Sequence, residues 1–467
     1  MNISSEYQKN SFDNLQIKNE TSFYKKIDLY KEEIGDNKEV HFYERARTIY
    51  KCLKKRLNLI TANGKIFWTD SFTYTCQQKK NLIEDISSSL KVLKSDEIIA
   101  IRLKEGPQGE TYVALMKSSG EIINILKKKF FYAEGSFKKI YKTQLCDLNA
   151  PKLEKYEKES LVAFKYLKSC EKQKEVISEF RKEGRLLKIL EQQKIKGFEA
   201  PFQALGVYIK GFKKGKGSYF PNTHFPPTFF AQSALYHNCN KREEHSLYNN
   251  WGKQKVLAAA IGLCESLRQC HDLGISLGDI KTSNILRKKE ALYFTDVGGA
   301  WIADEFKKIG YHRDIHTKGY SLKKDFTPLK LVNNIEEAKL LRQKIDVFSL
   351  GISIYEMISP IKLYDNNKPN DFENATAEFL GKKIRKNMVK KMGRNSSCLS
   401  ALTKLLKEMC DPDYRMRPSL SYVIESLQKI LTICQHQKST ASKKKIEDKS
   451  NQMRFENIKK NKRCTIF

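Results

Sequence analysis

The segment CHDLGISLGDIKTSNIL, from Cys270 to Leu286, constrains this chain more than any other part of its sequence. Asp279, Lys281 and Asn284 stand close together in it, on what must be a tight loop after a helix. An apolar strand, ALYFTDVGG, follows the loop and leads into Asp296. Phosphoryl transfer uses these residue types: one carboxylate orients the attacking hydroxyl, a second carboxylate and an amide hold magnesium, and a lysine neutralises charge.

This stretch resembles the catalytic core of eukaryotic-type protein kinases, in which the loop has the pattern H-R-D-L-K-x-x-N. The resemblance implies that Asp279 is the catalytic base and that Lys281 acts beside it. It also implies that Asn284 and Asp296 bind the metal, because D-V-G stands in the place of D-F-G. A lysine two positions after the aspartate is the serine/threonine-kinase form, so Ser and Thr hydroxyls of proteins are the expected acceptors.

Segments further upstream resemble the nucleotide-binding lobe of the same family. YAEGSFKKIY resembles the glycine-rich loop, and the residues that the resemblance assigns to ATP are Gly135, Ser136, Phe137 and Lys138. LVAFK resembles V-A-I-K, which implies that Ala163 lines the nucleotide site and that Lys165 pairs with the phosphates. FRKEGRLLKIL resembles the long helix of the small lobe, and its Glu183 would form the ion pair that positions Lys165.

Segments further downstream resemble the helical lobe. KIDVFSLGISIYEM resembles the central buried helix, whose Asp346 would hydrogen-bond to the backbone of the catalytic loop. DPDYRMRPS resembles the late signature with the structural arginine, here Arg417. The motifs follow the order of the family over residues 121–434, and this order predicts a two-lobed α+β fold that binds ATP with Mg²⁺ or Mn²⁺.

The lobes are expected at about 121–233 and 238–434, with a hinge near Ala234–His237 and a surface loop at Gly211–Pro227. Residues 1–120 are predicted to form an additional α/β region of unknown role. In that region a helix is expected at 45–57, a hairpin at 60–68, and strands at 98–103 and 111–116. Residues 435–467 are polar and basic, without apolar periodicity, and are predicted to be a disordered tail.

Several positions depart from the family pattern. Ala133 and Lys138 replace two glycines of the glycine-rich loop. Leu277 and Gly278 replace the histidine and the arginine before Asp279, and the missing arginine is the one that receives an activation-loop phosphate. Activity is therefore expected not to depend on such phosphorylation. No A-P-E motif is present either, and TKGY, at 317–320, is the nearest remnant of that region. Lys323–Lys324 stand where the glutamate of the motif should be. Arg417 is therefore left without an obvious partner.

Two other functions fit parts of the same pattern. A catalytically inactive pseudokinase scaffold would explain the degenerate loops, although the chain retains Lys165, Glu183, Asp279, Asn284 and Asp296. The order G-D-I-K-T-S-N is also similar to small-molecule phosphotransferases of the aminoglycoside type. Lys281, LVAFK and the D-V-F-S-L-G helix favour a protein kinase over that class.

Charge and cysteine usage indicate the setting in which the chain works. The formal net charge of +32 favours acidic partners, such as an anionic membrane, more than nucleic acid, because no base-stacking platform is visible. The eleven cysteines form no C-x-x-C pair, which argues for a reducing compartment and against structural disulfides. The sequence contains no signal peptide and no apolar run near the roughly 20 residues that span a bilayer.

The last four residues, CTIF, form a C-a-a-X box that predicts geranylgeranylation of Cys464 by a prenyltransferase. The basic residues just before it are Lys459, Lys460, Lys462 and Arg463. A prenyl group and a basic cluster together suffice for stable anchoring, here expected at the cytoplasmic face of a membrane. A divergent kinase with such a tail resembles effectors that intracellular bacteria secrete into host cells, and a lipidated eukaryotic kinase fits the same residues.

Overall fold

The structure is a computed structural model. It describes residues 37–62, 76–102, 111–134, 138–146, 161–167, 173–209, 228–234, 236–238, 251–303, 320–322, 325, 329, 332, 334–359, 363, 376–392 and 397–436. The chain forms two compact units, Met1–Gln173 with Gln203–Gln232, and Lys174–Phe202 with Ser233–Phe467. The first unit is mainly β-sheet and the second mainly helical, in agreement with the α+β fold that the sequence predicts, and each is described by itself.

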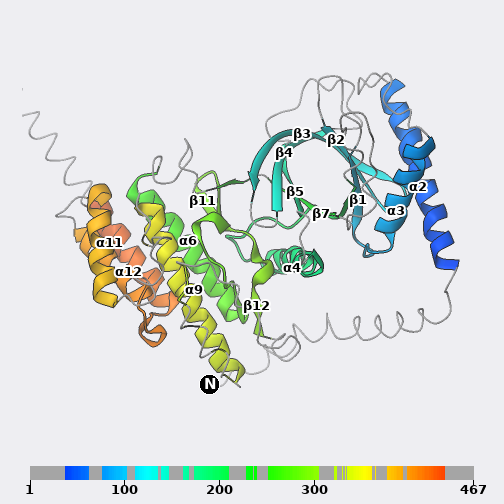
Figure 1. Cartoon of the computed structure of the whole chain (residues 1–467). Helices are drawn as coiled ribbons and strands as arrows, with labels where there is room; N and C mark the ends of the chain where they lie inside the picture. The colour runs from blue at the N-terminus through cyan, green and yellow to red at the C-terminus, as the bar shows by residue number, and fades with distance from the viewer. Residues whose placement is uncertain are drawn as a thin grey trace, which may run out of the picture. The chain divides into compact units, whose positions relative to one another are not determined.

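The first unit is built on a closed seven-stranded barrel with the order β1-β2-β3-β4-β5-β7-β6 (Figure 1). The strands are β1 (Ile98–Arg102), β2 (Thr111–Met116), β3 (Ile122–Glu134), β4 (Lys138–Cys146), β5 (Leu161–Leu167), β6 (Ala204–Ile209) and β7 (Thr228–Ala234). Most neighbours are antiparallel, but β1 runs parallel to β6, with Ile98 opposite Gly206. The pairing of β1 with β6 closes the barrel.

Gly206 is what allows β1 and β6 to pair so closely. A Cβ atom at this position would lie 1.9 Å from the backbone oxygen of Ile98. Side chains on β1 then alternate, as they must on a strand. Ile98 and Ala100 join one apolar cluster with Phe164, whereas Ile99 and Ile101 join another.

The second of these clusters lies under two helices, α2 (Asn37–Ala62) and α3 (Cys76–Leu90), which flank β1 and β2 (Figure 1). Their buried faces carry Ile49 and Leu53 from α2 and Leu82 and Ile86 from α3. The predicted domain boundary at residue 120 therefore falls inside the barrel, between β2 and β3. The hairpin predicted at 60–68 is wrong at its start, because α2 continues to Ala62, and its other residues lie outside the described ones.

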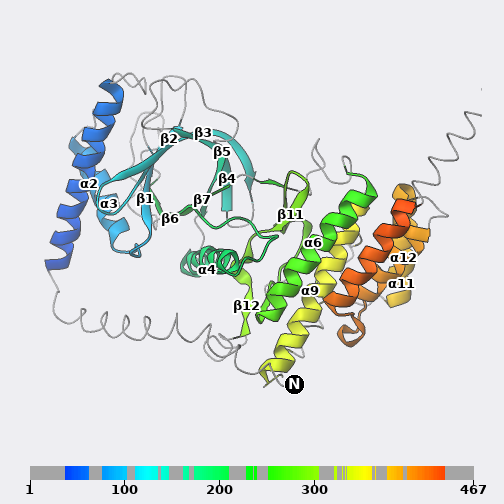
Figure 2. The same cartoon turned by 180° about the vertical axis from the view of Figure 1, so that it is seen from behind.

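The second unit is mainly helical (Figure 2). They are α4 (Gln173–Gln192), α6 (Lys253–Asp272), α9 (Ile335–Ile358), α11 (Ala377–Met392), α12 (Ser397–Met409) and a final helix over 420–436. Two short sheets accompany them. One has three strands, β11 (Ala291–Phe294), β10 (Ile285–Lys288) and β8 (His237–Asn238), and the other pairs β12 (Trp301–Ile302) with β9 (Ile275–Ser276). Asn334 caps α9 by accepting a bond from the Glu336 backbone N–H, the usual role of asparagine at this position.

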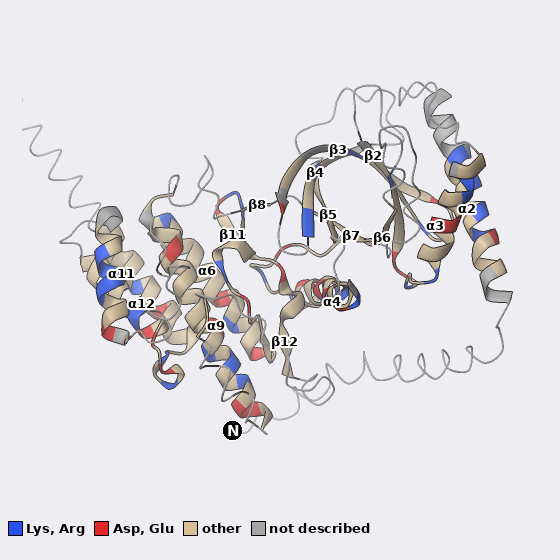
Figure 3. Ribbon diagram, in the orientation of Figure 1, with Lys and Arg blue, Asp and Glu red and all other residues tan. Residues whose placement is uncertain are grey.

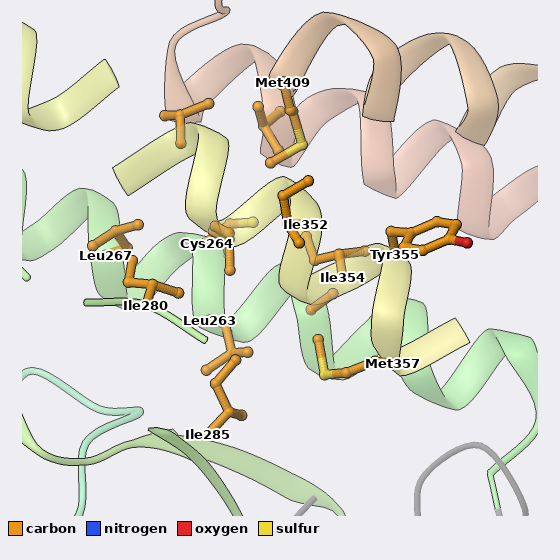
Figure 4. Close-up of a cluster of buried hydrophobic side chains, with 14 of the residues drawn as sticks. Leu263, Cys264, Leu267, Ile280, Ile285, Ile352, Ile354, Tyr355, Met357 and Met409 are labelled. Carbon is orange, nitrogen blue, oxygen red and sulfur yellow. The ribbon is translucent and has the colours of Figure 1, made fainter. Parts of the chain in front are cut away.

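One large apolar core holds this unit together. Figure 4 shows Ile280 of the catalytic loop beside Leu267 of α6, and Met409 of α12 beside Ile352 of α9. The loop is thus anchored in the core next to its functional residues. Contrary to the expectation from cysteine usage, a disulfide joins buried Cys398 and Cys434, with their Cα atoms 5.7 Å apart.

The charge excess of the sequence is spread over helices of both units. Figure 3 shows Lys and Arg along α2 and α11 in particular. Among the described residues, no helix is long and apolar enough to cross a membrane. Cys464, the basic tail after residue 436 and the insert Gly211–Pro227 lie outside the described residues.

Candidate active site

The backbone of the predicted catalytic loop is fixed by the side chain of Asp346, which lies in the middle of α9. This carboxylate is fully buried and accepts bonds from the backbone N–H groups of Leu277 and Gly278, each at 2.8 Å. His271 Nε2, at the end of α6, lies 3.0 Å from the same carboxylate. Gly278 has a φ of 76°, which glycine adopts without strain. Asp346 therefore holds the turn that immediately precedes Asp279.

Asp279, Lys281 and Asn284 meet within hydrogen-bonding distance after this turn. Lys281 Nζ lies 2.6 Å from Asp279 Oδ2. Asn284 Nδ2 donates to the backbone oxygen of Asp279 at 3.0 Å and to Asp279 Oδ2 at 3.2 Å. The Asp279 side chain is partly exposed, so its carboxylate can meet a substrate as well as its two neighbours. The structure thus brings together the three loop residues that the sequence singled out.

Asp296 is brought close to Asn284 by the hairpin of β10 and β11. Ile285 is opposite Phe294 in the register, and the Thr295 backbone N–H donates to the Asn284 oxygen at 3.0 Å. Asp296 itself has a φ of 60°, in the left-handed region that few residues other than glycine adopt. Such strain is common at functional sites and requires support from the surrounding structure.

The donor set of these two residues fits a magnesium ion. The amide nitrogen of Asn284 is engaged with Asp279, which leaves its amide oxygen for a cation. Asp296 is exposed and adds a carboxylate. Magnesium takes oxygen ligands and usually completes its shell with phosphates and water, so two protein oxygens are an ordinary contribution.

Helix α4 packs against the turn that follows Asp296. A Cβ atom on Gly298 would come within 2.6 Å of the Glu179 backbone oxygen, so this turn needs glycine. Lys182 Nζ donates to the Ala300 oxygen at 2.8 Å. Glu183, one residue further along α4, is 1% exposed. The helix that carries Glu183 is therefore fixed to the segment that carries Asp296.

The predicted nucleotide-contacting residues of the β-rich lobe lie on β4 and β5. Lys165 is opposite Ile140, and Lys165 and Ala163 are both buried. Lys138 begins β4, opposite Leu167. Gly135, Ser136 and Phe137 lie outside the described residues. Because Lys165 and Glu183 belong to different units, their ion pair stays a prediction.

Arg417 has the partner that the sequence analysis did not find. Its guanidinium lies 2.8 Å from Asp325 Oδ2, and both side chains are buried. Arg417 also donates to the backbone oxygens of Asp411 and Lys344. A signal was present in the sequence: Asp325 is the only acidic residue between Asp314 and Glu336.

Comparisons with known proteins find a protein kinase and the protein kinase family model as matches, in agreement with the site described above. A similar protein, the dual specificity protein kinase shkA of Dictyostelium discoideum, is 24% identical over 157 residues, which cover 33% of this chain and 27% of that relative. The chain thus matches less than a third of the relative's length. The family model for the protein kinase domain matches residues 149–431, more than half of the chain, and begins after the predicted glycine-rich loop. The chain belongs to the protein kinase family.

Proposed function

We propose that this protein transfers the γ-phosphate of ATP to serine or threonine hydroxyls of protein substrates. The observation that carries the proposal is the hydrogen-bonded group of Asp279, Lys281 and Asn284, on a loop whose backbone is fixed by buried Asp346. Phosphoryl transfer needs mainly positioning and charge stabilisation, and a rigid group of this composition supplies both.

Each side chain has a distinct task in the proposed reaction. The acceptor hydroxyl oxygen forms a bond to the γ-phosphorus while the bond from that phosphorus to the bridging oxygen of ADP breaks. Asp279 orients the hydroxyl and accepts its proton, and Lys281 stabilises the negative charge of the transferred group. Asn284 and Asp296 would hold magnesium, which when bound supplies positive charge beside the phosphates. Lys165, supported by Glu183, would contact the α- and β-phosphates.

The choice of serine and threonine rests on Lys281, two residues after Asp279. The Dictyostelium relative carries the name of a dual specificity kinase, so transfer to tyrosine is the outcome to compare. Phosphoamino-acid analysis of labelled protein distinguishes the two.

The first experiment measures transfer of labelled γ-phosphate from Mg-ATP to the protein itself and to a generic basic protein. The wild type is compared with Asp279→Asn, and Asp272→Asn serves as control because Asp272 is an exposed aspartate at the end of α6. Label that disappears only in Asp279→Asn supports the proposal. Label on aminoglycoside- or choline-like alcohols instead would favour a small-molecule phosphotransferase. Absence of label with magnesium and with manganese would favour the scaffold.

Attachment to a membrane stays a prediction from the C-a-a-X pattern, whose residues lie outside the described ones. Incubation of the full chain with a geranylgeranyl donor and its transferase, followed by mass spectrometry of Cys464, tests it directly. Cys464→Ser is the matched control, and an unmodified Cys464 would contradict the prediction.

A further inference from the structure

Thr282 lies between Lys281 and Asn284, in the short helical turn η2 (Thr282–Asn284), and is only 1% exposed. Its hydroxyl oxygen lies 2.9 Å from the phenolic oxygen of Tyr320 and 3.1 Å from Glu356 Oε2. Tyr320 belongs to the segment that follows the D-V-G turn, and Glu356 lies near the end of α9. Three segments that are distant in the sequence therefore meet at a single buried hydroxyl.

The three oxygens form a triangle of close contacts in which two protons are available, one from Thr282 and one from Tyr320. Tyr320 donates its phenolic proton to the same oxygen of Glu356 that accepts from Thr282. Burial, followed by the negative charge of Glu356, raises the pKa of Tyr320 well above its usual value. The phenol therefore remains a donor at neutral pH. An ionised carboxylate that accepts two hydroxyl protons makes stronger bonds than a neutral acceptor does.

The backbone of Tyr320 is held by the same helix. Ser349 Oγ, on α9, donates to the Tyr320 oxygen at 2.6 Å. The next two residues, Ser321 and Leu322, are buried. Asp325 then pairs with Arg417. The end of this segment is thus fixed to the helical core by side-chain, backbone and ion-pair contacts.

We propose that Thr282 is a positioning residue that couples the segment at Tyr320 to the catalytic loop. By this coupling it takes the place of the arginine–phosphate contact that Gly278 cannot make. This inference rests on the proposed kinase activity and concerns how its catalytic loop is held. The hydroxyl of Thr282 is the only atom of the triangle that belongs to the loop, so its removal should release Lys281 and Asn284 while Tyr320 and Glu356 stay bonded to each other.

The test compares Thr282→Val, which removes the hydroxyl at constant shape, with Thr282→Ser, which keeps it. We expect Thr282→Val to lower kcat roughly tenfold, as loss of a hydrogen bond to a charged group would, with KM for ATP changed less than about twofold. Thr282→Ser should restore most of kcat. A purely structural role would instead lower the melting temperature of both variants without separating kcat from KM.

A second measurement does not require activity. Amide hydrogen exchange of peptides that contain 280–286 and 320–322 should become faster in Thr282→Val and remain near wild type in Thr282→Ser. Unchanged exchange, or faster exchange with unchanged kcat, overturns the inference.

If the wild type transfers no phosphate, the proposed function fails, and the coupling of the two segments is still judged by exchange alone. If Thr282→Val does not fold, Tyr320→Phe, which removes the other hydroxyl, is measured in its place with the same expectations.

Discussion

Asp325 and Arg417 form a buried ion pair between the end of the activation segment and the last part of the helical lobe, with 2.8 Å between Oδ2 and Nη2. The guanidinium also lies over the ring of Phe348 on α9, 4.6 Å from its centroid. Arg417 thus contacts three separate segments at once. The A-P-E glutamate was expected where Lys323–Lys324 stand. Asp325, the next residue, provides the carboxylate that pairs with Arg417 instead.

Asp325→Asn should destabilise the helical unit strongly. The substitution leaves the Arg417 charge buried without its counter-ion, and breaking such a pair costs about 3–5 kcal/mol. Chemical denaturation of the full chain measures the loss. Glu425→Gln is the control, because it removes an exposed pair with Lys429 and should change stability little. Equal midpoints for Asp325→Asn and this control would mean that the buried pair does not form.

Asp346→Asn should lower both stability and activity. The amide offers one acceptor oxygen where the carboxylate offers two, so the N–H of Leu277 or Gly278 loses its partner. A lost hydrogen bond to a buried charge corresponds to about 1.5–3 kcal/mol of unfolding free energy. We also expect kcat to fall at least tenfold, because Asp279 follows directly on this turn. Glu337→Gln, an exposed change on the same helix, is the control. Full activity in Asp346→Asn would show that the turn is held by other contacts.

Local patterns in the sequence were sufficient to predict the helical lobe. The loop around Asp279, the D-V-G turn and the D-V-F-S-L-G helix are continuous segments with strong residue preferences, and their order predicted the two-lobed fold. The strands expected at 98–103 and 111–116 are present as β1 and β2. Asp325 was missed as the partner of Arg417 because Lys323–Lys324 stand where the A-P-E glutamate was expected. A carboxylate that is shifted by one residue within a loop leaves no periodic signal in the sequence.

Barrel closure could not be predicted in the same way. β1 pairs with β6, whose residue Gly206 is far away in the sequence. The sequence of neither strand indicates which strand it pairs with. Long-range pairing depends on the shape of both surfaces, which alternation within one strand does not encode. For this reason residues 1–120 are predicted from the sequence to be an additional region, although β1 and β2 complete the barrel and α2 and α3 cover it.

Gly206→Ala tests that closure. The new methyl group would lie 1.9 Å from the Ile98 oxygen, so the two strands must move apart. We expect a loss of about 2–3 kcal/mol, in the range of overpacked cores, together with faster hydrogen exchange in β1 and β6. Gly262→Ala on α6 is the matched control, since a Cβ there meets nothing within 4 Å and alanine favours helix by about 1 kcal/mol. Unchanged exchange in Gly206→Ala would refute the parallel pairing.

The stability of the first unit should depend on the ionisation of Asp85 on α3. Burial, with a smaller contribution from Glu84, raises the pKa of this carboxyl to about 6, whereas an unfolded aspartate titrates near 3.9. The folded state therefore binds the Asp85 proton more tightly than the unfolded state does. This difference adds to the free energy of unfolding below about pH 4, and the contribution is lost as pH rises from about 4 to 6.

Asp85→Asn should accordingly stabilise the protein at neutral pH. Because the side chain is partly exposed, solvent screening reduces the gain to about 1–2 kcal/mol at pH 7, and it should vanish below about pH 4. Denaturation at the two pH values gives both numbers. Asp96→Asn, at an exposed position, should show no such pH dependence. A gain that is equal at pH 4 and pH 7 would exclude ionisation of Asp85 as its cause.

Removal of phosphate from the activation segment should leave activity near wild type. Gly278 stands where the phosphate-binding arginine would be, and the segment is held by Tyr320 and Asp325 through uncharged and carboxylate contacts instead. Thr317→Ala and phosphatase treatment of the wild type should therefore change kcat less than about twofold, whereas Tyr320→Phe should lower it roughly tenfold. Ser321→Ala is a poor probe because Ser321 is buried and its substitution would disturb packing. If dephosphorylation abolished activity while Tyr320→Phe had no effect, the segment would be ordered by a phosphate bound elsewhere, and the hydrogen-bonded contacts of Tyr320 would have no part in positioning the catalytic loop.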